Sequence, residues 1–243
     1  MSEIYLYDEI VEEKYTDWDG NWHGFDPNDL AETLRAEDEG GEVDIYINSP
    51  GGSVFAAVAM TSEIKRAIQR GVKVNAYVDG IAASAASFLI MACETVNMYS
   101  GTMLMVHKPM SFCIGNADDF LKAADDLEAI QEGTCMPLYR SKLKVDEEEL
   151  KALISSESWL PAQKAAEIFD IVIIDELKDV NNSMSEDILA KYGYKHVPEQ
   201  LIKTPEIAPA QKPAEDINQP EKTPEPVDYS GWEDRINNLG GKR

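Results

Sequence analysis

A run of alanine and serine residues between two regular segments holds the first chemically useful group of this chain. Residues 80–87 read Gly-Ile-Ala-Ala-Ser-Ala-Ala-Ser, between a strand-like run at 72–78 and a helix-compatible run at 88–92. A strand, a tight turn and a helix start expose a serine hydroxyl, and free N–H groups at the helix start can face a developing oxyanion. Ser84 is therefore a candidate nucleophile. Simple close packing of a helix on a strand is the alternative explanation of the small residues. Catalysis therefore also requires a base and oxyanion donors elsewhere in the chain.

A serine nucleophile needs a base, and the chain has three histidines. His23 lies in an irregular N-terminal segment and His196 in a proline-rich tail. His107 directly follows the strand-like run at 103–106, at the kind of strand exit where α/β sheets present functional groups. An isolated histidine there is more often satisfied by backbone groups. Serine and histidine at two separate strand exits favour catalysis.

A third loop offers backbone donors. Residues 48–52 read Asn-Ser-Pro-Gly-Gly, after one strand-like run and before a helical one. A Gly-Gly turn there frees N–H groups that can stabilise an oxyanion or cradle a phosphate. The loop lacks the spacing and the lysine of a phosphate-binding loop, so nucleotide binding is the weaker use. An ordinary turn is the structural alternative.

The elements that must position these groups alternate along the chain. Period-two and buried-strand patterns predict strands, and helical spacing with capping residues predicts the helices between them. This order is typical of an α/β layer fold built from repeated β-α-β units. The predicted strands cover 4–7, 43–47, 72–78, 95–99, 103–106 and 171–174, and the predicted helices cover 30–34, 54–68, 88–92, 117–142, 147–154 and 162–168.

Three motifs together resemble a known family. Asn48-Ser-Pro-Gly-Gly52, Gly80-x-Ala-Ala-Ser84 and Met105-Val-His107-x-Pro109 occur in the order and approximate spacing of the Clp protease proteolytic subunit (ClpP) family. The resemblance runs from about residue 4 to 180 and implies a ClpP/crotonase-like α/β fold. Within the family, the chain looks most like phage head-maturation proteases, which cleave scaffold and capsid proteins during prohead assembly.

The resemblance implies a role for each matching residue. The family's nucleophile falls on Ser84 and its general base on His107. Its oxyanion donors fall on the backbone N–H groups of Gly52 and Ala85. Such a serine endopeptidase cleaves peptides through an acyl-enzyme, and we expect no cofactor and no metal ion.

At the acid of the catalytic triad, the sequence departs from the family's pattern. The family's Asp-x-aromatic-Leu-x-Ala pattern reads Glu-Ser-Trp-Leu-Pro-Ala at 157–162, which assigns the acid to Glu157. Glutamate can orient an imidazole as aspartate does, with a different reach; a solvated acid at a helix end is the alternative. The family's following glycine turn is missing at 168–172, which makes Asp170 a reserve candidate.

Composition limits the class of partner and the compartment. The net charge of −23, of which −20 falls on the first 184 residues, disfavours nucleic acid and other anionic partners. The longest apolar run, 81–92, is too short to span a bilayer, and the N-terminus lacks the features of a secretory signal. Cys93, Cys113 and Cys135 have no paired spacing and are typical of reduced thiols. We expect a cytoplasmic protein, or a prohead-interior one if phage-encoded, without membrane contact.

The sequence divides at about residue 184. Residues 1–184 form the predicted peptidase domain, and 185–243 hold seven of the twelve prolines in a composition that cannot bury a core. We expect a disordered tail, with a docking motif or simply a solvated end at 229–239. The long helix predicted at 117–142 corresponds to the segment with which family members pair their rings, so a ring-forming homo-oligomer acting on protein substrates is expected.

Other functions remain open on the sequence alone. The chain could be a housekeeping Clp subunit that works with an ATPase unfoldase, or a non-catalytic scaffold on the same fold. A crotonase-type acyl-CoA protein would use similar oxyanion loops but needs no Ser-His pair. A Ser-Lys dyad is disfavoured because His107 stands where the base is expected.

Overall fold

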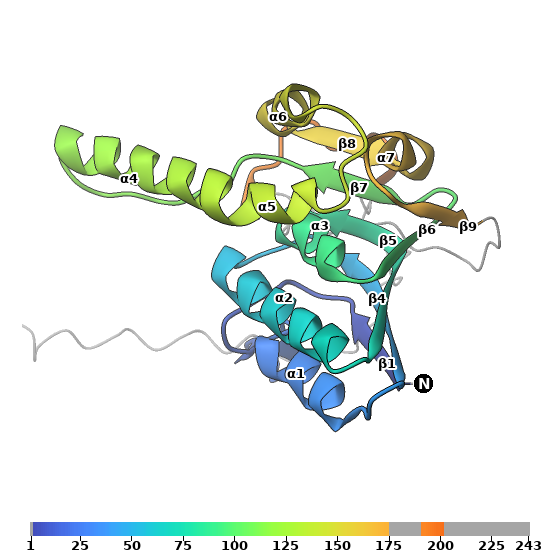
Figure 1. Cartoon of the computed structure of the whole chain (residues 1–243). Coiled ribbons are helices and arrows are strands. Elements are labelled where there is room, and N and C mark those ends of the chain that lie inside the picture. Colours follow the sequence, from blue (N-terminus) through green and yellow to red (C-terminus); the bar gives the residue numbers. More distant parts are fainter. Residues whose placement is uncertain (1, 175–190, 202–243) are drawn as a thin grey trace, which may run out of the picture. The chain divides into compact units, whose positions relative to one another are not determined.

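The computed structural model describes residues 2–174 and 191–201, which belong to one compact unit, Met1–Thr204. Its centre is a parallel sheet in the order β1-β4-β5-β6-β9 (Figure 1). The strands are β1 (Ser2–Leu6), β4 (Glu42–Ser49), β5 (Lys73–Ala83), β6 (Thr95–Tyr99) and β9 (Val172–Ile174). This confirms the predicted α/β class.

Helices cover one face of this sheet. The helices α1 (Pro27–Ala36), α2 (Val54–Gln69) and α3 (Ala85–Leu89) lie on the same side in Figure 1. Asp26 and Asp29 form a capping box at the start of α1, which satisfies N–H groups that the helix itself leaves unpaired. A single large core of buried side chains joins the helices to the strands. The rigid layer that results is the platform for the loops at the strand ends.

The strand β5 is longer than the sequence indicated. We predicted its end near residue 78, but it continues to Ala83. Its first half pairs with β6, and its second half, Ile81–Ala83, pairs in parallel with β7 (Met103–Val106). A register shift between β4 and β5 at Ile47–Ser49 accompanies this change of neighbour. The turn before the helix therefore falls on Ser84 itself.

One strand next to β7 was not predicted from the sequence. The strand β8 (Ser158–Pro161) pairs antiparallel with it, with Met105 opposite Trp159. It lies between α6 (Glu147–Ser155) and α7 (Ala162–Ile168), both of which were predicted. Only four residues long and ending in proline, β8 carries too short a pattern to be recognised by alternation.

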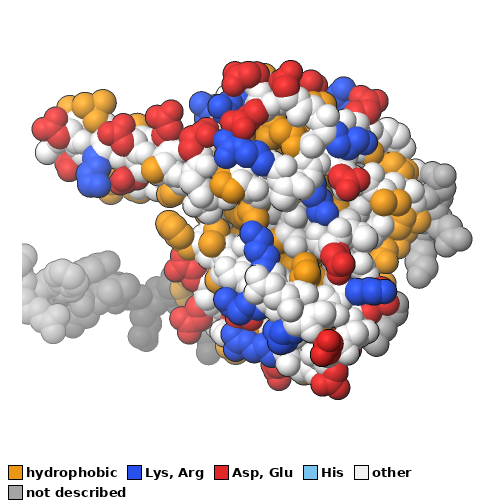
Figure 2. Space-filling model, viewed as in Figure 1, with side chains coloured by type: hydrophobic (Ala, Val, Ile, Leu, Met, Phe, Trp, Pro, Cys, Tyr) orange, Lys and Arg blue, Asp and Glu red, His pale blue; other side chains and the backbone are white. Residues whose placement is uncertain are grey.

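The long helix predicted at 117–142 is interrupted. It consists of α4 (Ala117–Ile130), a π-helical turn (Gln131–Cys135) and α5 (Met136–Arg140). Pro137 lacks the N–H that an α-helix needs and its ring crowds the preceding turn, which explains the local widening. None of the residues of α4 is buried, and the helix extends away from the layers (Figure 1). Figure 2 shows acidic and apolar side chains together along it.

The remaining described parts come from the beginning and the end of the described sequence. The N-terminal irregular segment contains a small hairpin, β2 (Tyr15–Thr16) with β3 (Trp22–His23). Residues 191–201, which end in a 3-10 turn at Glu199–Leu201, pack against the sheet, so described structure extends beyond the boundary predicted at residue 184. The rest of the predicted disordered tail, including the motif at 229–239, lies outside the described residues.

Two features bear on the predicted environment. No helix among the described residues is both long and apolar enough to cross a membrane. All three cysteines are free thiols, and burial raises the pKa of Cys93 to about 12 and that of Cys135 to about 11. These two thiols therefore stay protonated at neutral pH and behave as small apolar side chains.

Candidate active site

Ser84 stands at a strained turn between β5 and α3. Its backbone has φ 54° and ψ −121°, a conformation that non-glycine residues rarely adopt. Hydrogen bonds fix it: Ser84 N–H donates to Met105 O over 3.0 Å, and Ser84 O accepts from Ser87 N–H over 2.9 Å. Such strain persists only where surrounding structure imposes it, and it is concentrated at functional sites. The turn holds the hydroxyl at the carboxyl edge of the sheet.

The pairing of β5 with β7 brings His107 to this hydroxyl. Ala83 lies opposite Met105, so that the residues following the two strands are neighbours. Ser84 Oγ and His107 Nε2 are 2.7 Å apart, which is within hydrogen-bonding distance. The two residues are 23 positions apart in the sequence, and the sheet register alone brings them together.

Burial determines the charge of the imidazole. It lowers the pKa of His107 below its ordinary value, and the negative charge of Glu157 partly opposes this by raising it. The ring is therefore neutral at pH 7, and Nε2 can accept a proton from Ser84. Among the described residues, no hydrogen-bond partner faces His107 Nδ1.

The Gly-Gly loop after β4 approaches the nucleophile closely. Gly51 has φ +95°, and a Cβ placed on it would lie 2.5 Å from Ala83 O and 2.7 Å from Ser84 Cβ. Gly52 has φ +144°, and its Cβ would lie 2.0 Å from Ile10 O. Only glycine fits at either position. The resemblance assigned an oxyanion donor to Gly52, whereas the contact of Gly51 with the serine turn leaves no signal in the sequence.

The loop is also tied to the N-terminal segment. Ile10 N–H donates to Gly51 O over 2.7 Å, and Ser53 N–H donates to Ile10 O over 2.8 Å. Among the described residues, Gly52 N–H donates to no acceptor. Ala85, as the first residue of α3, has an N–H without an intrahelical acceptor. Ala85 directly follows Ser84 in the chain, and Gly52 directly follows Gly51, which approaches the serine turn.

Substituting Gly51 with alanine tests this close approach. We expect Gly51→Ala to lower kcat/KM by about 100-fold, because displacing the serine turn by about 1 Å misaligns the reacting atoms. Gly101→Ala is the matched control, since Gly101 has φ +96° and an added Cβ would meet nothing within 4 Å. Steady-state kinetics on a peptide substrate and a thermal melt are measured for both. Equal kcat/KM in the two variants would contradict the proposed contact.

The two candidate acids lie in different surroundings. Glu157 has φ +50° at the junction of α6 and β8, and its Oε1 accepts the N–H groups of Lys195 (2.6 Å) and His196 (2.9 Å). Its charge acts on the pKa of His107, but its carboxylate makes no hydrogen bond to that ring in the described structure. Asp170 lies beside the α5–α6 connection, where its N–H donates to Lys142 O over 2.7 Å. Glu157 is the better placed of the two.

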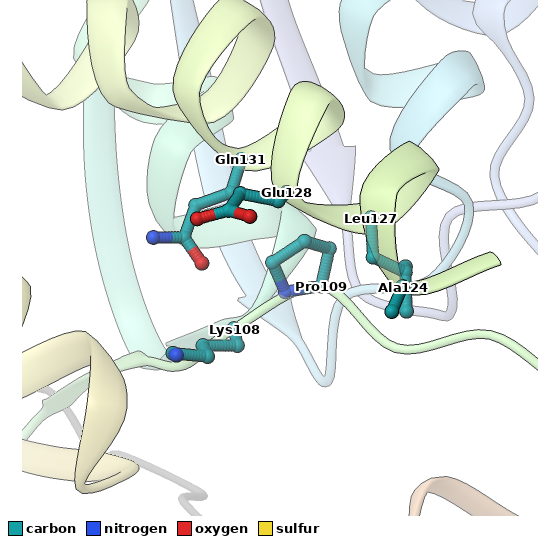
Figure 3. A pocket seen from close by; sticks show the side chains of 6 residues that line it. All are labelled: Lys108, Pro109, Ala124, Leu127, Glu128 and Gln131. Carbon is teal, nitrogen blue, oxygen red and sulfur yellow. The ribbon is translucent and has the colours of Figure 1, made fainter. Parts of the chain in front are cut away.

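Two hollows flank the Ser-His pair. The smaller, of about 20 Å³, is bounded by both residues and by apolar side chains; the larger, of about 300 Å³, lies between the strand exit and α4 (Figure 3). Pro109 lines both. The smaller hollow is lined by Val54, Ser84, Phe88, His107, Pro109, Cys135 and Tyr139, and the larger by Lys108, Pro109, Ala124, Leu127, Glu128 and Gln131.

Ser87 has a structural position. Its side chain is completely buried, and its Oγ lies 2.6 Å from both Ser84 O and Tyr139 Oη. It therefore fixes the start of α3 against α5, as expected for a packing residue. His23 is paired with Asp17 in the N-terminal hairpin at 2.9 Å, and the N–H of His196 is bonded to Glu157. Of the three histidines, His107 is the one whose ring is bonded to Ser84.

A parallel α/β sheet that presents a hydrogen-bonded Ser-His pair and a Gly-Gly loop at its carboxyl edge defines a class of ClpP-like folds. The family model described as Clp protease matches residues 30–178, more than half of the chain, and the chain belongs to this family. Similar curated proteins include two ATP-dependent Clp protease proteolytic subunits 2. That of Thermobifida fusca (strain YX) is 32% identical over 138 residues, which cover 55% of this chain and 65% of the relative. That of Mycolicibacterium paratuberculosis (strain ATCC BAA-968 / K-10) is 28% identical over 139 residues, covering 55% and 66%. The matches thus span slightly less than two thirds of these relatives.

Proposed function

We propose that this chain is a serine endopeptidase that cleaves proteins through an acyl-enzyme on Ser84. The observation that carries the proposal is the 2.7 Å contact between Ser84 Oγ and His107 Nε2 at the edge of the sheet. In the proposed mechanism, His107 removes the hydroxyl proton while Ser84 Oγ attacks the peptide carbonyl. The N–H groups of Gly52 and Ala85 stabilise the oxyanion. His107 then gives the proton to the leaving amine, and water hydrolyses the acyl-enzyme by the reverse roles.

Glu157 is the proposed acid of this triad. A carboxylate beside the imidazole stabilises the imidazolium that forms when Ser84 is deprotonated. Its influence on the pKa of His107 supports this role. Its Oε1 accepts the N–H groups of Lys195 and His196, which leaves Oε2 as the oxygen that can accept from Nδ1 once the side chain turns toward the ring.

The lining of the smaller hollow supports a preference for one type of side chain on the substrate residue before the scissile bond. Apart from the catalytic pair, its lining is formed mainly by Val54, Phe88, Pro109 and Tyr139. Since Tyr139 Oη is already bonded to Ser87, this lining favours a small apolar side chain. Larger side chains would require Phe88 or Pro109 to move.

Covalent labelling tests the proposal directly. A fluorophosphonate probe should form a stable adduct with the full-length protein, and mass spectrometry of the digest should map it to Ser84. Such a probe reacts with an activated serine, so labelling also separates the peptidase from a non-catalytic scaffold and from an acyl-CoA protein of related fold. An adduct on a different serine, or none in a folded protein, would reject the assignment.

Membership of the family is consistent with two kinds of protein substrate. The motif resemblance supports processing of capsid or scaffold proteins during phage head maturation. The names of the two relatives support a proteolytic subunit that works with an ATPase. Cleavage of a folded protein only when ATP and an unfoldase are added would favour the proteolytic subunit that works with an ATPase. Cleavage of co-expressed capsid or scaffold protein without them would favour a role in phage head maturation.

A ring-forming homo-oligomer is also part of the proposal. The exposed apolar side chains of α4, among them Phe120 (53% exposed) and Leu121 (66%), provide a surface for pairing with another copy. Sedimentation analysis should show an assembly larger than a dimer. A stable monomer at high protein concentration would contradict this part of the proposal.

A further inference from the structure

The segment Lys191–Leu201 lies directly over the proposed catalytic pair, and Tyr194 is its central contact. The Tyr194 ring meets the His107 ring edge to face, with 5.5 Å between centroids, and meets the Trp159 ring in the same way at 5.9 Å. Its hydroxyl donates to Pro50 O over 2.6 Å. Pro50 directly precedes the Gly-Gly loop, so Tyr194 spans the space between that loop and the base. Its side chain is 9% exposed.

Both ends of the segment are anchored to the domain. Near its start, Lys191 Nζ lies 2.5 Å from Glu9, and the Tyr192 hydroxyl is bonded to the same carboxylate. At its end, Leu201 is buried in a small apolar cluster with the strands β5 and β7. The cluster is formed by Ile81, Ala83, Met103, Met105, Tyr194 and Leu201. The segment is thus held at its start by Glu9, in its middle by the contacts of Tyr194 beside the Ser-His pair, and at its end by the burial of Leu201.

The segment also engages the proposed acid. Oε1 of Glu157 accepts two of its backbone N–H groups, those of Lys195 and His196. While these bonds persist, the carboxylate is directed to the segment, and His107 Nδ1 has no acceptor among the described residues. One segment thus covers one face of the His107 ring, while Ser84 and His107 both remain partly exposed, and it engages one oxygen of the carboxylate that could hydrogen-bond Nδ1.

We propose that residues Lys191–Leu201 form an autoinhibitory strap that occupies the substrate cleft and must be displaced before Ser84 can be acylated. An extended substrate needs free carbonyl acceptors beside the nucleophile, and Tyr194 holds the carbonyl of Pro50. Displacement frees this acceptor, opens the face of His107 and releases Glu157 in one step. This inference rests on the proposed peptidase function, since the strap is inhibitory only if Ser84 is the nucleophile.

The contacts of the strap are suited to reversible displacement. Lys195 and His196, which hold Glu157, are themselves exposed. Trp159, which the Tyr194 ring contacts, keeps a buried indole N–H without an acceptor in the described part of the chain. An unsatisfied buried donor opposes the closed state. A substrate that binds only the open state can therefore shift the population toward it.

The test compares the rate at which a fluorophosphonate labels full-length variants. Tyr194→Ala removes the central contact, and Leu201→Asp places a charge in the apolar anchor. We expect each to raise the labelling rate at least about fivefold, because the competent fraction increases. Glu199→Gln is the matched control, since Glu199 is an exposed strap residue without a contact to the site. Its rate should equal that of the original chain.

Two outcomes would overturn the strap while leaving the peptidase proposal intact. One is a measurable labelling rate that is the same in all four proteins. The other is slower labelling of Tyr194→Ala, which would mean that Tyr194 assists the reaction. If none of the four proteins is labelled, the peptidase proposal fails. Amide hydrogen exchange then tests separately whether the strap is bound to the domain. Protected amides at Lys195 and His196 that exchange faster in Tyr194→Ala support a seated strap, whereas unprotected amides in the original chain reject it.

Discussion

Replacing Ser84 with alanine is expected to lower kcat for peptide cleavage by about 10⁶-fold, the scale of losing the nucleophile of a serine triad. The oxygen that attacks the carbonyl is removed, and Ser87 Oγ cannot replace it, because it is buried between Ser84 O and Tyr139. The fold should be retained, since the backbone N–H and C=O of Ser84, which the substitution keeps, hold the turn in place. Single-turnover cleavage of a peptide and a thermal melt measure the two effects.

Ser62→Ala provides the matched control for this substitution. Ser62 lies in α2, and its Oγ donates to Val58 O within the same helix over 3.0 Å. Losing this bond leaves the strand exits untouched, so kcat should stay within about twofold of the original. Residual activity of Ser84→Ala above about 1% of the original, with the melt unchanged, would transfer the role of nucleophile to another group.

The sequence predicted those parts of the site whose conformation depends on a few neighbouring residues. The Gly-Gly loop, the small residues around Ser84 and the proline after His107 each belong to one strand exit. Alternation along the chain predicts that these exits share an edge of the sheet. What alternation does not contain is the register of β5 with β7. That register, which depends on the extension of β5 to Ala83, sets the 2.7 Å contact.

Other features depended on contacts between distant segments. The close approach of Gly51 to Ser84 requires the packing of two loops that are more than 30 residues apart. The interruption of the long helix before Pro137 has, by contrast, a local cause, because proline cannot donate within a helix. Tyr194 lies in a stretch whose composition resembles that of the tail, and its role depends on three aromatic and polar partners. A local pattern carries no signal for such a contact.

Replacing His107 with alanine is expected to lower kcat by a similar factor, about 10⁴- to 10⁶-fold, because it removes the base that is hydrogen-bonded to Ser84 Oγ. The pH profile of the original chain reports on the same group. Since burial lowers the pKa of His107, kcat/KM should rise with pH through a midpoint below the ordinary histidine value of 6.5. Above that midpoint the imidazole is neutral and can act as the base.

The same profile separates the two candidate acids. Glu157 raises the pKa of His107, so removing its charge in Glu157→Gln should move the midpoint to still lower pH. It should also lower kcat, because the imidazolium of the transition state loses its stabilising charge. Asp170→Asn is the matched control and should leave both quantities unchanged, since Asp170 lies beside Lys142 rather than His107. A shift in Asp170→Asn with none in Glu157→Gln would assign the acid to Asp170.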